Sequence, residues 1–351
     1  MSKLLLAGPA SIHLWRYYQM VKAELDDIAV ITDADPGTAL PEGCKITVLP
    51  LSLRHPFAFA RSIRIIRKLI DTYQPDIIHC HMANTAALAV NLAKRGLQIP
   101  TVLTAWGSDI LIAPFQNLAL RKLVRYNLKQ AKILTSDSRY MADRMQELVP
   151  EKRLDLRIAN FGIGVRPDPS VAKENLIYSN RLHESLYRID AILRAFKQFT
   201  ENAPETWTLV IAGTGSQTPY LKKLVQELKI KGRVRFVGWL SAAENEAYYN
   251  RAKLYVSIPE SDATSISLLE SMACRCIPIV SNLPANREWV KNGMNGVIVD
   301  DVTSPFFQAA LDLDAFSAQE YNRKLIERWG TVKANRAVFR KIYLELTESN
   351  K

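Results

Sequence analysis

Short runs rich in valine, isoleucine and leucine alternate with longer amphipathic segments along most of the chain. Short apolar runs bounded by turn residues are typical of buried strands, and apolar positions three or four apart are typical of helices. Regular alternation of the two predicts parallel sheets covered by helices on both faces. The predicted strands are 3–7, 28–32, 46–49, 77–80, 101–104, 132–135, 176–179, 207–212, 234–237, 253–257 and 277–280.

The alternation stops once, at the glycine- and proline-containing segment 160–167, and then starts again. A chain of 351 residues also exceeds the ~250–300 residues at which a single hydrophobic core stops growing. The sequence therefore predicts an α/β protein of two doubly wound domains, at 1–165 and 166–325.

The composition is that of an ordinary globular protein, with 48% apolar and 23% charged residues. Met1-Ser2-Lys3 leads directly into a predicted strand, unlike a signal peptide, and no apolar run approaches the ~20 residues of a membrane-spanning helix. The four cysteines show no zinc-binding spacing. We expect a protein of the reducing cytoplasm that needs neither a metal nor a cofactor.

The segment 261–273 carries the clearest chemistry, because Asp262 and Glu270 lie eight positions apart across a turn that opens a helix near Ser265. Thr264, Ser265 and Ser267 supply hydroxyl groups, and the first amides of a helix have no partners within it, so a diphosphate fits there. Glu270 would then reach a ribose diol, while Asp262 stays near the reacting sugar. The alternative interpretation is an acidic loop followed by an ordinary helix.

A predicted strand at 276–281 and a second loop at 282–290 follow. Together the two blocks resemble the donor-nucleotide signature of the retaining family-4 glycosyltransferases of GT-B architecture, in which an acid precedes a glutamate by eight positions. Three positions depart from that pattern, with Asp262 in place of Glu, Ala263 in place of Gly and Arg275 in place of Gly. The side chain of Asp262 is one methylene shorter than that of the usual Glu.

The resemblance implies two Rossmann-like domains that face each other across a crevice. The domain at 1–165 would bind the acceptor, and the domain at 166–325 would bind the nucleotide sugar. Residues 326–351 would form a helix that returns to the first domain. This last helix is expected within 321–346, anchored by Trp329, Phe339 and Tyr343.

The resemblance also implies a set of donor-binding residues in the second domain. They are Arg181, Arg188, Gly213, Gly215, Trp239, Leu240, Thr264, Ser265, Ile266, Ser267 and Glu270. Arg181 follows a strand, where open α/β sheets bind ligands. Arg188 is the nearest substitute for a lysine that relatives carry. For Gly213 and Gly215 a plain turn explains the pattern as well, and for Trp239 a core position does.

In the first domain, the resemblance points to a loop after the strand at 101–104 and to residues that follow two other strands. The expected acceptor-binding residues are Ser11, His13, His81, Trp106 and Asp109. The expected catalytic residues are Asp109, Asp262, Arg181 and His13. For Asp109 the alternative is a helix N-cap.

The formal net charge of +11 indicates an anionic partner or surface. No acid occurs at 43–70 or 110–136, and both stretches carry arginine and lysine among aliphatic residues. Basic amphipathic helices dock to anionic membranes, so we expect peripheral attachment to the inner face of the cell membrane. The alternative is that the isoleucines face the core and the arginines face water.

The sequence thus predicts a retaining, metal-independent hexosyltransferase. It would move a sugar from a nucleoside diphosphate donor, UDP- or GDP-linked, to a saccharide or lipid-linked acceptor. The resemblance favours a role in bacterial surface polysaccharide or lipooligosaccharide synthesis. Two alternatives stay open, namely a nucleotide-sugar 2-epimerase of the same fold and a nonenzymatic nucleic-acid-binding protein. Base, sugar, acceptor and linkage are not determined by the sequence.

Overall fold

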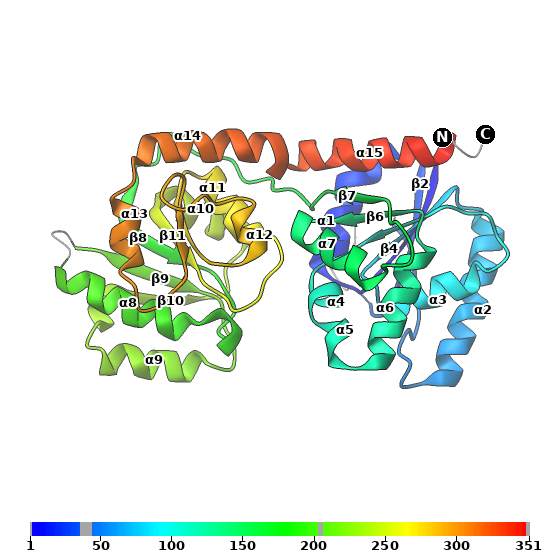
Figure 1. The fold of residues 1–351 in the computed structure, drawn as a ribbon, viewed down its shortest axis with the longest axis horizontal. Helices are drawn as coiled ribbons and strands as arrows, with labels where there is room; N and C mark the ends of the chain where they lie inside the picture. The colour runs from blue at the N-terminus through cyan, green and yellow to red at the C-terminus, as the bar shows by residue number, and fades with distance from the viewer. Residues whose placement is uncertain (1, 36–43, 203–205, 349–351) are drawn as a thin grey trace. The chain divides into compact units, whose positions relative to one another are not determined.

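The computed structural model describes residues 2–35, 44–202 and 206–348. The chain folds as two units (Figure 1). Unit 1 consists of Met1–Phe161 together with Val332–Lys351, and unit 2 consists of Gly162–Thr331. The expected boundaries at 165/166 and 325/326 thus differ from the observed divisions by a few residues.

Within the described residues, unit 1 forms a seven-stranded parallel sheet of order β3-β2-β1-β4-β5-β6-β7. The strands are β1 (Lys3–Ala7), β2 (Asp27–Thr32), β3 (Lys45–Val48), β4 (Ile77–His81), β5 (Thr101–Thr104), β6 (Ile133–Ser136) and β7 (Leu156–Ile158). The strand order reverses between β1 and β4, and ligands bind at such a switch point in open α/β sheets.

Helices cover both faces of this sheet. They are α1 (Ile12–Val21), α2 (Pro56–Tyr73), α3 (Thr85–Ala93), α4 (Ser108–Leu111), α5 (Ala113–Gln116), α6 (Leu118–Gln130), α7 (Arg139–Leu148) and α15 (Val332–Glu348). Successive residues of β1 pack on opposite faces, with Leu5 in the core beneath α2, α3 and α6, and Leu4 and Leu6 in the core beneath α1 and α15. This alternation is what a strand buried on both faces requires.

Within the described residues, unit 2 forms a six-stranded parallel sheet of order β10-β9-β8-β11-β12-β13. The strands are β8 (Glu174–Ser179), β9 (Thr208–Ala212), β10 (Val234–Gly238), β11 (Ala252–Ser257), β12 (Ile277–Ser281) and β13 (Val297–Val299). The helices are α8 (Ile189–Asn202), α9 (Thr218–Glu227), α10 (Ala242–Arg251), α11 (Ile266–Ala273), α12 (Pro284–Arg287), α13 (Phe306–Leu311) and α14 (Ala315–Leu325). The switch point lies between β8 and β11.

The prediction of two doubly wound α/β domains is confirmed. The pattern missed two strands of three residues each, β7 and β13, because so short a run carries no periodicity. No described helix is long and apolar enough to span a bilayer.

The segment 321–346 is not one continuous helix, and the helix that belongs to unit 1 is α15. Helix α14 ends at Leu325, a π-helical turn covers Ile326–Gly330, and α15 begins at Val332. The carbonyl of Gly330 accepts from the amide of Ile163, and Thr331 is extended, which ends the helix. Trp329 is 51% exposed, whereas Phe339 and Tyr343 are buried in unit 1 against α1 and the sheet.

Candidate functional site

The predicted donor-binding residues of unit 2 gather at the carboxyl edge of its sheet. Arg181 follows the end of β8, and Asp262 lies in the loop between β11 and α11. Since β8 and β11 are the neighbours at the switch point, parallel pairing brings these two side chains to the same place. The structure therefore joins residues that are 81 positions apart in the chain.

The guanidinium of Arg181 is held by three groups. One nitrogen, Nη2, donates to Oδ2 of Asp262 at 2.7 Å, and Nη1 donates to the hydroxyl of Ser265 at 2.6 Å. The guanidinium carbon lies 4.6 Å from the centre of the Tyr187 ring, a cation–π distance. The side chains of Arg181 and Asp262 keep 12% and 22% of their surface exposed, so the pair is shielded but reachable.

Burial and charge act in opposite directions on this pair. Burial alone would lower the pKa of Arg181, but the carboxylate of Asp262 together with Tyr255 and Tyr187 outweighs burial, and the pKa is raised. Burial raises the pKa of Asp262, and Arg181 only partly opposes that effect. Arg181 is therefore a fixed cation, and Asp262 is a carboxylate whose charge depends on its partner.

Helix α11 starts beside this pair. Ser265 is its N-cap residue, but the Ser265 hydroxyl makes no capping bond and accepts from Arg181 instead. The amides of Leu268 and Leu269 donate to the Ser265 carbonyl, so the amides of Ile266 and Ser267 precede the first bonds of the helix. Such amides and the helix dipole attract an anion. With Arg181 alongside, the arrangement suits a diphosphate.

Glu270 lies further along α11 and is partly buried among aromatic residues. Burial raises the pKa of Tyr178 and of Tyr249, and the charge of Glu270 adds to the rise in both. Asn180 joins this group by donating to the Tyr249 hydroxyl at 2.7 Å. Glu270 is thus a charged group in an otherwise neutral polar wall, consistent with recognition of sugar hydroxyls.

Gly213 and Gly215 let the loop after β9 pack against the loop after β8. Gly213 has φ +103°, and a Cβ there would lie 2.5 Å from the carbonyl oxygen of Arg181. A Cβ on Gly215 would lie 2.5 Å from the carbonyl oxygen of His183. Both glycines are needed for this close approach. The contribution of both glycines to donor binding remains a prediction, whereas Gly213 lies directly against the Arg181 main chain.

Arg188 has a role that differs from the one expected. Its Nε donates to the carbonyl of Ile258 at 2.7 Å, and its Nη2 donates to the carbonyl of Pro259 at 3.0 Å. The amide of Glu260 in turn donates to the carbonyl of Leu186 at 2.9 Å. The guanidinium is therefore committed to the main chain at the start of the acidic loop, which favours positioning over contact with phosphate.

Trp239 and Leu240 follow β10 at the same edge of the sheet. Trp239 is 74% exposed, so the core interpretation of this aromatic is wrong. Leu240 is partly buried against one face of the unit 2 core. The amide of Gly213 donates to the carbonyl of Gly238 at 2.7 Å and ties the two loops together. The prediction that these side chains flank the donor base stays a prediction.

In unit 1, His13 and His81 lie at the switch point between β1 and β4. Trp106 Nε1 donates to Nδ1 of His81 at 3.0 Å, and the His13 ring packs 5.4 Å from Trp106 and 5.5 Å from Phe161. In the described part of the chain, Nδ1 of His13 and Nε2 of His81 are buried without a hydrogen-bond partner. Burial lowers the pKa of both histidines, so they are neutral at pH 7. Phe161 is a member that no sequence signal indicated.

Ser11 and Asp109 have structural partners. The Ser11 hydroxyl caps α1 by accepting from the amide of Leu14 at 3.4 Å. Asp109 is 3% exposed, and its carboxylate accepts from the amides of Ala83, Trp106 and Gly107 at 2.8–3.0 Å. The carboxylate thus has a structural role, and the expectation that it also orders a sugar stays a prediction. Asp109 ties the loops after β4 and β5 together.

A buried polar network lies behind the unit 1 switch point. Nδ1 of His79 is 2.8 Å from the hydroxyl of Tyr343 and 3.1 Å from that of Tyr17, and Nε2 is 2.7 Å from the hydroxyl of Thr104. Burial lowers the pKa of His79 to about 3. A neutral His79 therefore links α15 and α1 to the sheet.

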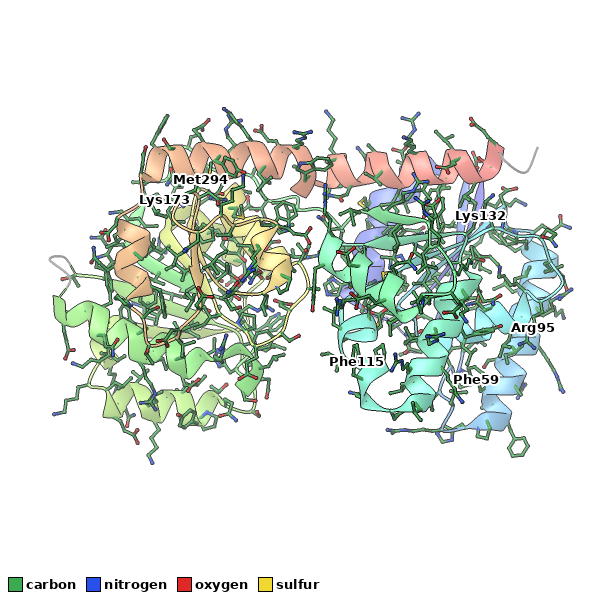
Figure 2. The ribbon with its side chains drawn as sticks, viewed as in Figure 1. Phe59, Arg95, Phe115, Lys132, Lys173 and Met294 are labelled. Atoms are coloured by element: carbon green, nitrogen blue, oxygen red, sulfur yellow. The ribbon has the colours of Figure 1, made fainter. Side chains whose placement is uncertain are left out.

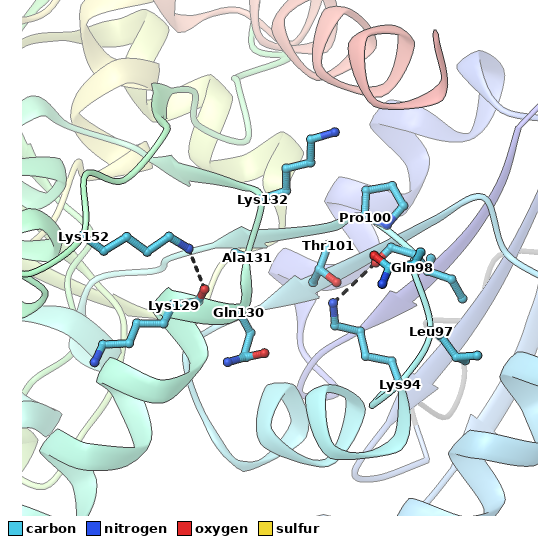
Figure 3. Close-up of a pocket in the computed structure, with 11 residues that line it drawn as sticks. Lys94, Leu97, Gln98, Pro100, Thr101, Lys129, Gln130, Ala131, Lys132 and Lys152 are labelled. Atoms are coloured by element: carbon cyan, nitrogen blue, oxygen red, sulfur yellow. Dashed lines mark hydrogen bonds between the residues drawn. The ribbon is translucent and has the colours of Figure 1, made fainter. Parts of the chain in front are cut away.

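A hollow of about 330 Å³ in unit 1 contains lysines but lies away from these sites (Figure 3). It is bordered by the amino ends of β5 and β6, opposite the switch-point edge. Lys94 donates to the carbonyl of Ile99 at 3.4 Å, and Lys152 donates to that of Lys129 at 2.7 Å. These lysines thus bond to main-chain carbonyl groups just before β5 and in the last turn of α6. Across the described residues, no group of three or more His, Cys, Asp or Glu side chains is placed to hold a metal.

Comparison with known proteins gives matches over both units. The model of "Glycosyl transferases group 1" matches residues 167–328, and the model of "Glycosyl transferase 4-like" matches residues 3–138. The N-acetyl-alpha-D-glucosaminyl L-malate synthase of Bacillus anthracis is 26% identical over 269 residues, which cover 72% of this chain and 68% of that protein.

Two solved structures share the fold over nearly the whole chain. The structure of Anabaena HepE in complex with UDP has a TM-score of 0.79 at 15% identity, covering 98% of this chain and 100% of that one. The sucrose-phosphate synthase of Thermosynechococcus elongatus has a TM-score of 0.83 at 14% identity, covering 99% and 100%. At such identities the likeness is one of fold.

Proposed function

The chain belongs to the group 1 glycosyltransferases of GT-B fold, which use nucleotide-sugar donors, and from this premise we propose that it is a retaining, metal-independent hexosyltransferase. The donor is a nucleoside diphosphate sugar, UDP- or GDP-linked. One observation carries the proposal: Arg181, Asp262 and the start of α11 meet at the switch point of unit 2.

In the proposed mechanism, unit 2 binds the departing diphosphate. Arg181 and the amides of Ile266 and Ser267 stabilise the negative charge that develops as the glycosidic bond breaks. Diphosphate binding competes with Asp262 for Arg181, which frees the Asp262 carboxylate to face the sugar as positive charge develops on it. Arg181 and the two amides supply positive charge without a metal ion. Glu270 binds the ribose.

The acceptor is proposed to bind unit 1 near His13, His81 and Trp106. Neutral histidines with unpartnered nitrogens suit hydrogen bonds to sugar hydroxyls, and aromatic rings suit the apolar face of a sugar. His13 is the candidate for general acid–base catalysis, because its side chain is less buried than that of His81. No enzymic nucleophile is assigned, and attack by the acceptor on the face that the diphosphate leaves would give retention.

We further propose that the acceptor is a saccharide or lipid-linked saccharide of bacterial surface polysaccharide or lipooligosaccharide synthesis. The enzyme would work at the inner face of the cell membrane. The two acid-free basic stretches in unit 1, at 43–70 and 110–136, support this location.

Incubation of the chain with UDP- and GDP-sugars without an acceptor tests the activity. We expect slow release of free sugar and nucleoside diphosphate from one donor, insensitive to EDTA, with the released sugar first appearing as the donor's own anomer in the proton NMR spectrum. R181A should abolish the release, and the exposed control R194A should not. Accumulation of an epimerised nucleotide sugar, or first release of the opposite anomer, would contradict the proposal.

A further inference from the structure

Large apolar side chains are exposed at the end of unit 1 where α2 and α6 begin. Leu53 and Phe57 precede and open α2 and are 48% and 91% exposed. Phe115 of α5 and Leu118, the first residue of α6, are 65% and 74% exposed. Figure 1 shows α2 and α6 starting at the same end of the unit, and Figure 2 shows Phe115 there. We call these four side chains the apolar tip.

The hydrophobic core does not account for the apolar tip. Helix α2 buries Phe59, Ser62, Ile66 and Ile70 against unit 1, and Ile63 is partly buried there, as the alternative interpretation of the sequence held, whereas Ile65 is 37% exposed. Phe57 lies outside that buried face. Several large apolar side chains exposed at one end of a unit are typical of an interaction surface.

Unpaired basic residues surround the apolar tip. Arg54 and Arg61 flank Phe57, Arg121 and Lys122 follow Leu118, and all four are exposed. Across the described residues none of these four side chains forms an ion pair, whereas Arg67 and Arg125, further along the helices, pair with Asp71 and Glu151. Positive charge is therefore left unneutralised where the apolar side chains protrude.

We propose that this end of unit 1 is a docking surface for an anionic lipid bilayer. The apolar tip enters the boundary between headgroups and acyl chains, and Arg54, Arg61, Arg121 and Lys122 bind lipid phosphates. Exposed aromatic and aliphatic side chains beside cations are complementary to a bilayer, which has an apolar interior and anionic headgroups at its surface. Bases of a nucleic acid would instead require a platform of adjacent aromatic rings.

The position of this surface also bears on acceptor binding, an argument that rests on the proposed function. The loops after β3 and β5 lie at the same carboxyl edge of the sheet as His13, in the first turn of α1, and His81, the last residue of β4. Docking of the apolar tip would hold the acceptor-binding edge of unit 1 against the membrane. A lipid-linked acceptor would then reach that edge without leaving the bilayer.

Sedimentation of the full chain with lipid vesicles tests the proposal. We expect binding to vesicles of phosphatidylcholine with phosphatidylglycerol and not to phosphatidylcholine alone. The variant F57S/F115S should lower the partition coefficient at least about tenfold, because each phenylalanine contributes burial in the bilayer. F316S is the matched control, since Phe316 of unit 2 is 76% exposed, and it should bind as the parent does.

A second pair of variants tests the charges. R54Q/R61Q/K122Q should lose most of the vesicle binding, while R194Q/K231Q/K324Q removes as much exposed charge from unit 2 and should keep it. Unchanged melting curves would show that each variant is folded. Equal loss in test and control variants, no binding by the parent, or tighter binding to a single-stranded oligonucleotide than to the vesicles would overturn the docking surface. If the parent chain releases free sugar and nucleoside diphosphate from its donor but does not bind vesicles, the proposed function stays intact and only the docking surface is overturned.

Discussion

Arg181 and Asp262 form an ion pair of 2.7 Å across the switch point of the unit 2 sheet. The two residues were predicted separately, as a cation for the diphosphate and as an acid near the sugar. In the proposed mechanism, a diphosphate bound to Arg181 would compete with Asp262 for the same guanidinium. Donor binding and the release of the Asp262 carboxylate would then be coupled, and this coupling can be measured.

D262N should strengthen UDP binding while it weakens sugar transfer. Removal of the carboxylate leaves Arg181 free for the diphosphate, so the Kd for UDP should fall by about three- to tenfold. The rate of donor hydrolysis should fall by about 100-fold or more, because the charge that faces the sugar is lost. Calorimetric titration with UDP measures the first effect. D312N removes an exposed charge from the same unit and is the control; unchanged or weaker UDP binding by D262N would refute the coupling.

E270A should remove most of the thermal stabilisation that UDP gives. Ligand that binds the native state raises stability by RT ln(1 + [L]/Kd), so a Kd weakened about tenfold or more removes most of the shift at moderate concentration. The comparison is a thermal-shift titration beside E260A, which alters an exposed acid in the loop that precedes α11. A full-size shift in E270A would exclude the ribose assignment.

G213A should disturb Arg181 directly. The added methyl group would meet the Arg181 carbonyl oxygen at 2.5 Å, on a backbone with φ +103°. We expect a loss of about 2–4 kcal/mol in the free energy of unfolding of unit 2 and weaker UDP binding. Chemical denaturation measures the first. G232A is the control because a Cβ there meets nothing within 4 Å. Parent-like stability of G213A would show that the loop can move away.

Substitutions of Arg188 distinguish a role in positioning the acidic loop from a role as a positive charge for phosphate. If its two main-chain bonds fix the acidic loop, then R188K, which keeps the charge but cannot bond both carbonyls in the same geometry, should weaken UDP binding nearly as much as R188Q. We expect both to raise the Kd about tenfold. Retention of parent affinity by R188K alone would instead assign Arg188 to the phosphate.

The stability of unit 1 should fall as the pH is lowered below about 6.5. The pKa of His79 is about 3 in the folded chain and ~6.5 when unfolded, so the unfolded state binds more protons between these values. The stability contribution is therefore complete above the unfolded pKa and is lost as the pH falls toward the folded one, with roughly 3–5 kcal/mol at stake. Thermal melts between pH 4 and 7.5 should show a flatter dependence for H79Q. An identical slope would contradict the assignment.

The sequence was sufficient to predict the architecture because the apolar pattern of a strand can be recognised without knowledge of its tertiary contacts. β1 and β5 were predicted at their observed bounds. The break between α14 and α15 was not, since it depends on a bond from Ile163 to Gly330, which are distant in the chain. Periodicity carries no signal for such tertiary contacts.

The candidate site was predictable where a residue type and its strand end coincide, as for Arg181. The roles of Asp109 and Arg188 were harder to predict. A charged residue near a strand end gives the same sequence signal whether its side chain contacts a ligand or backbone amides and carbonyls. Tyr187 and Phe161 had no signal at all, since an aromatic residue becomes part of a site only through the neighbours that the fold brings to it.

A crystal structure of the chain with UDP bound tests the central claim most directly. We predict the diphosphate at the start of α11, with its oxygens about 3 Å from the Arg181 guanidinium and from the amides of Ile266 and Ser267, and with the Arg181–Asp262 pair opened. A nucleotide bound away from α11, or a diphosphate that leaves Arg181 paired with Asp262, would contradict the account.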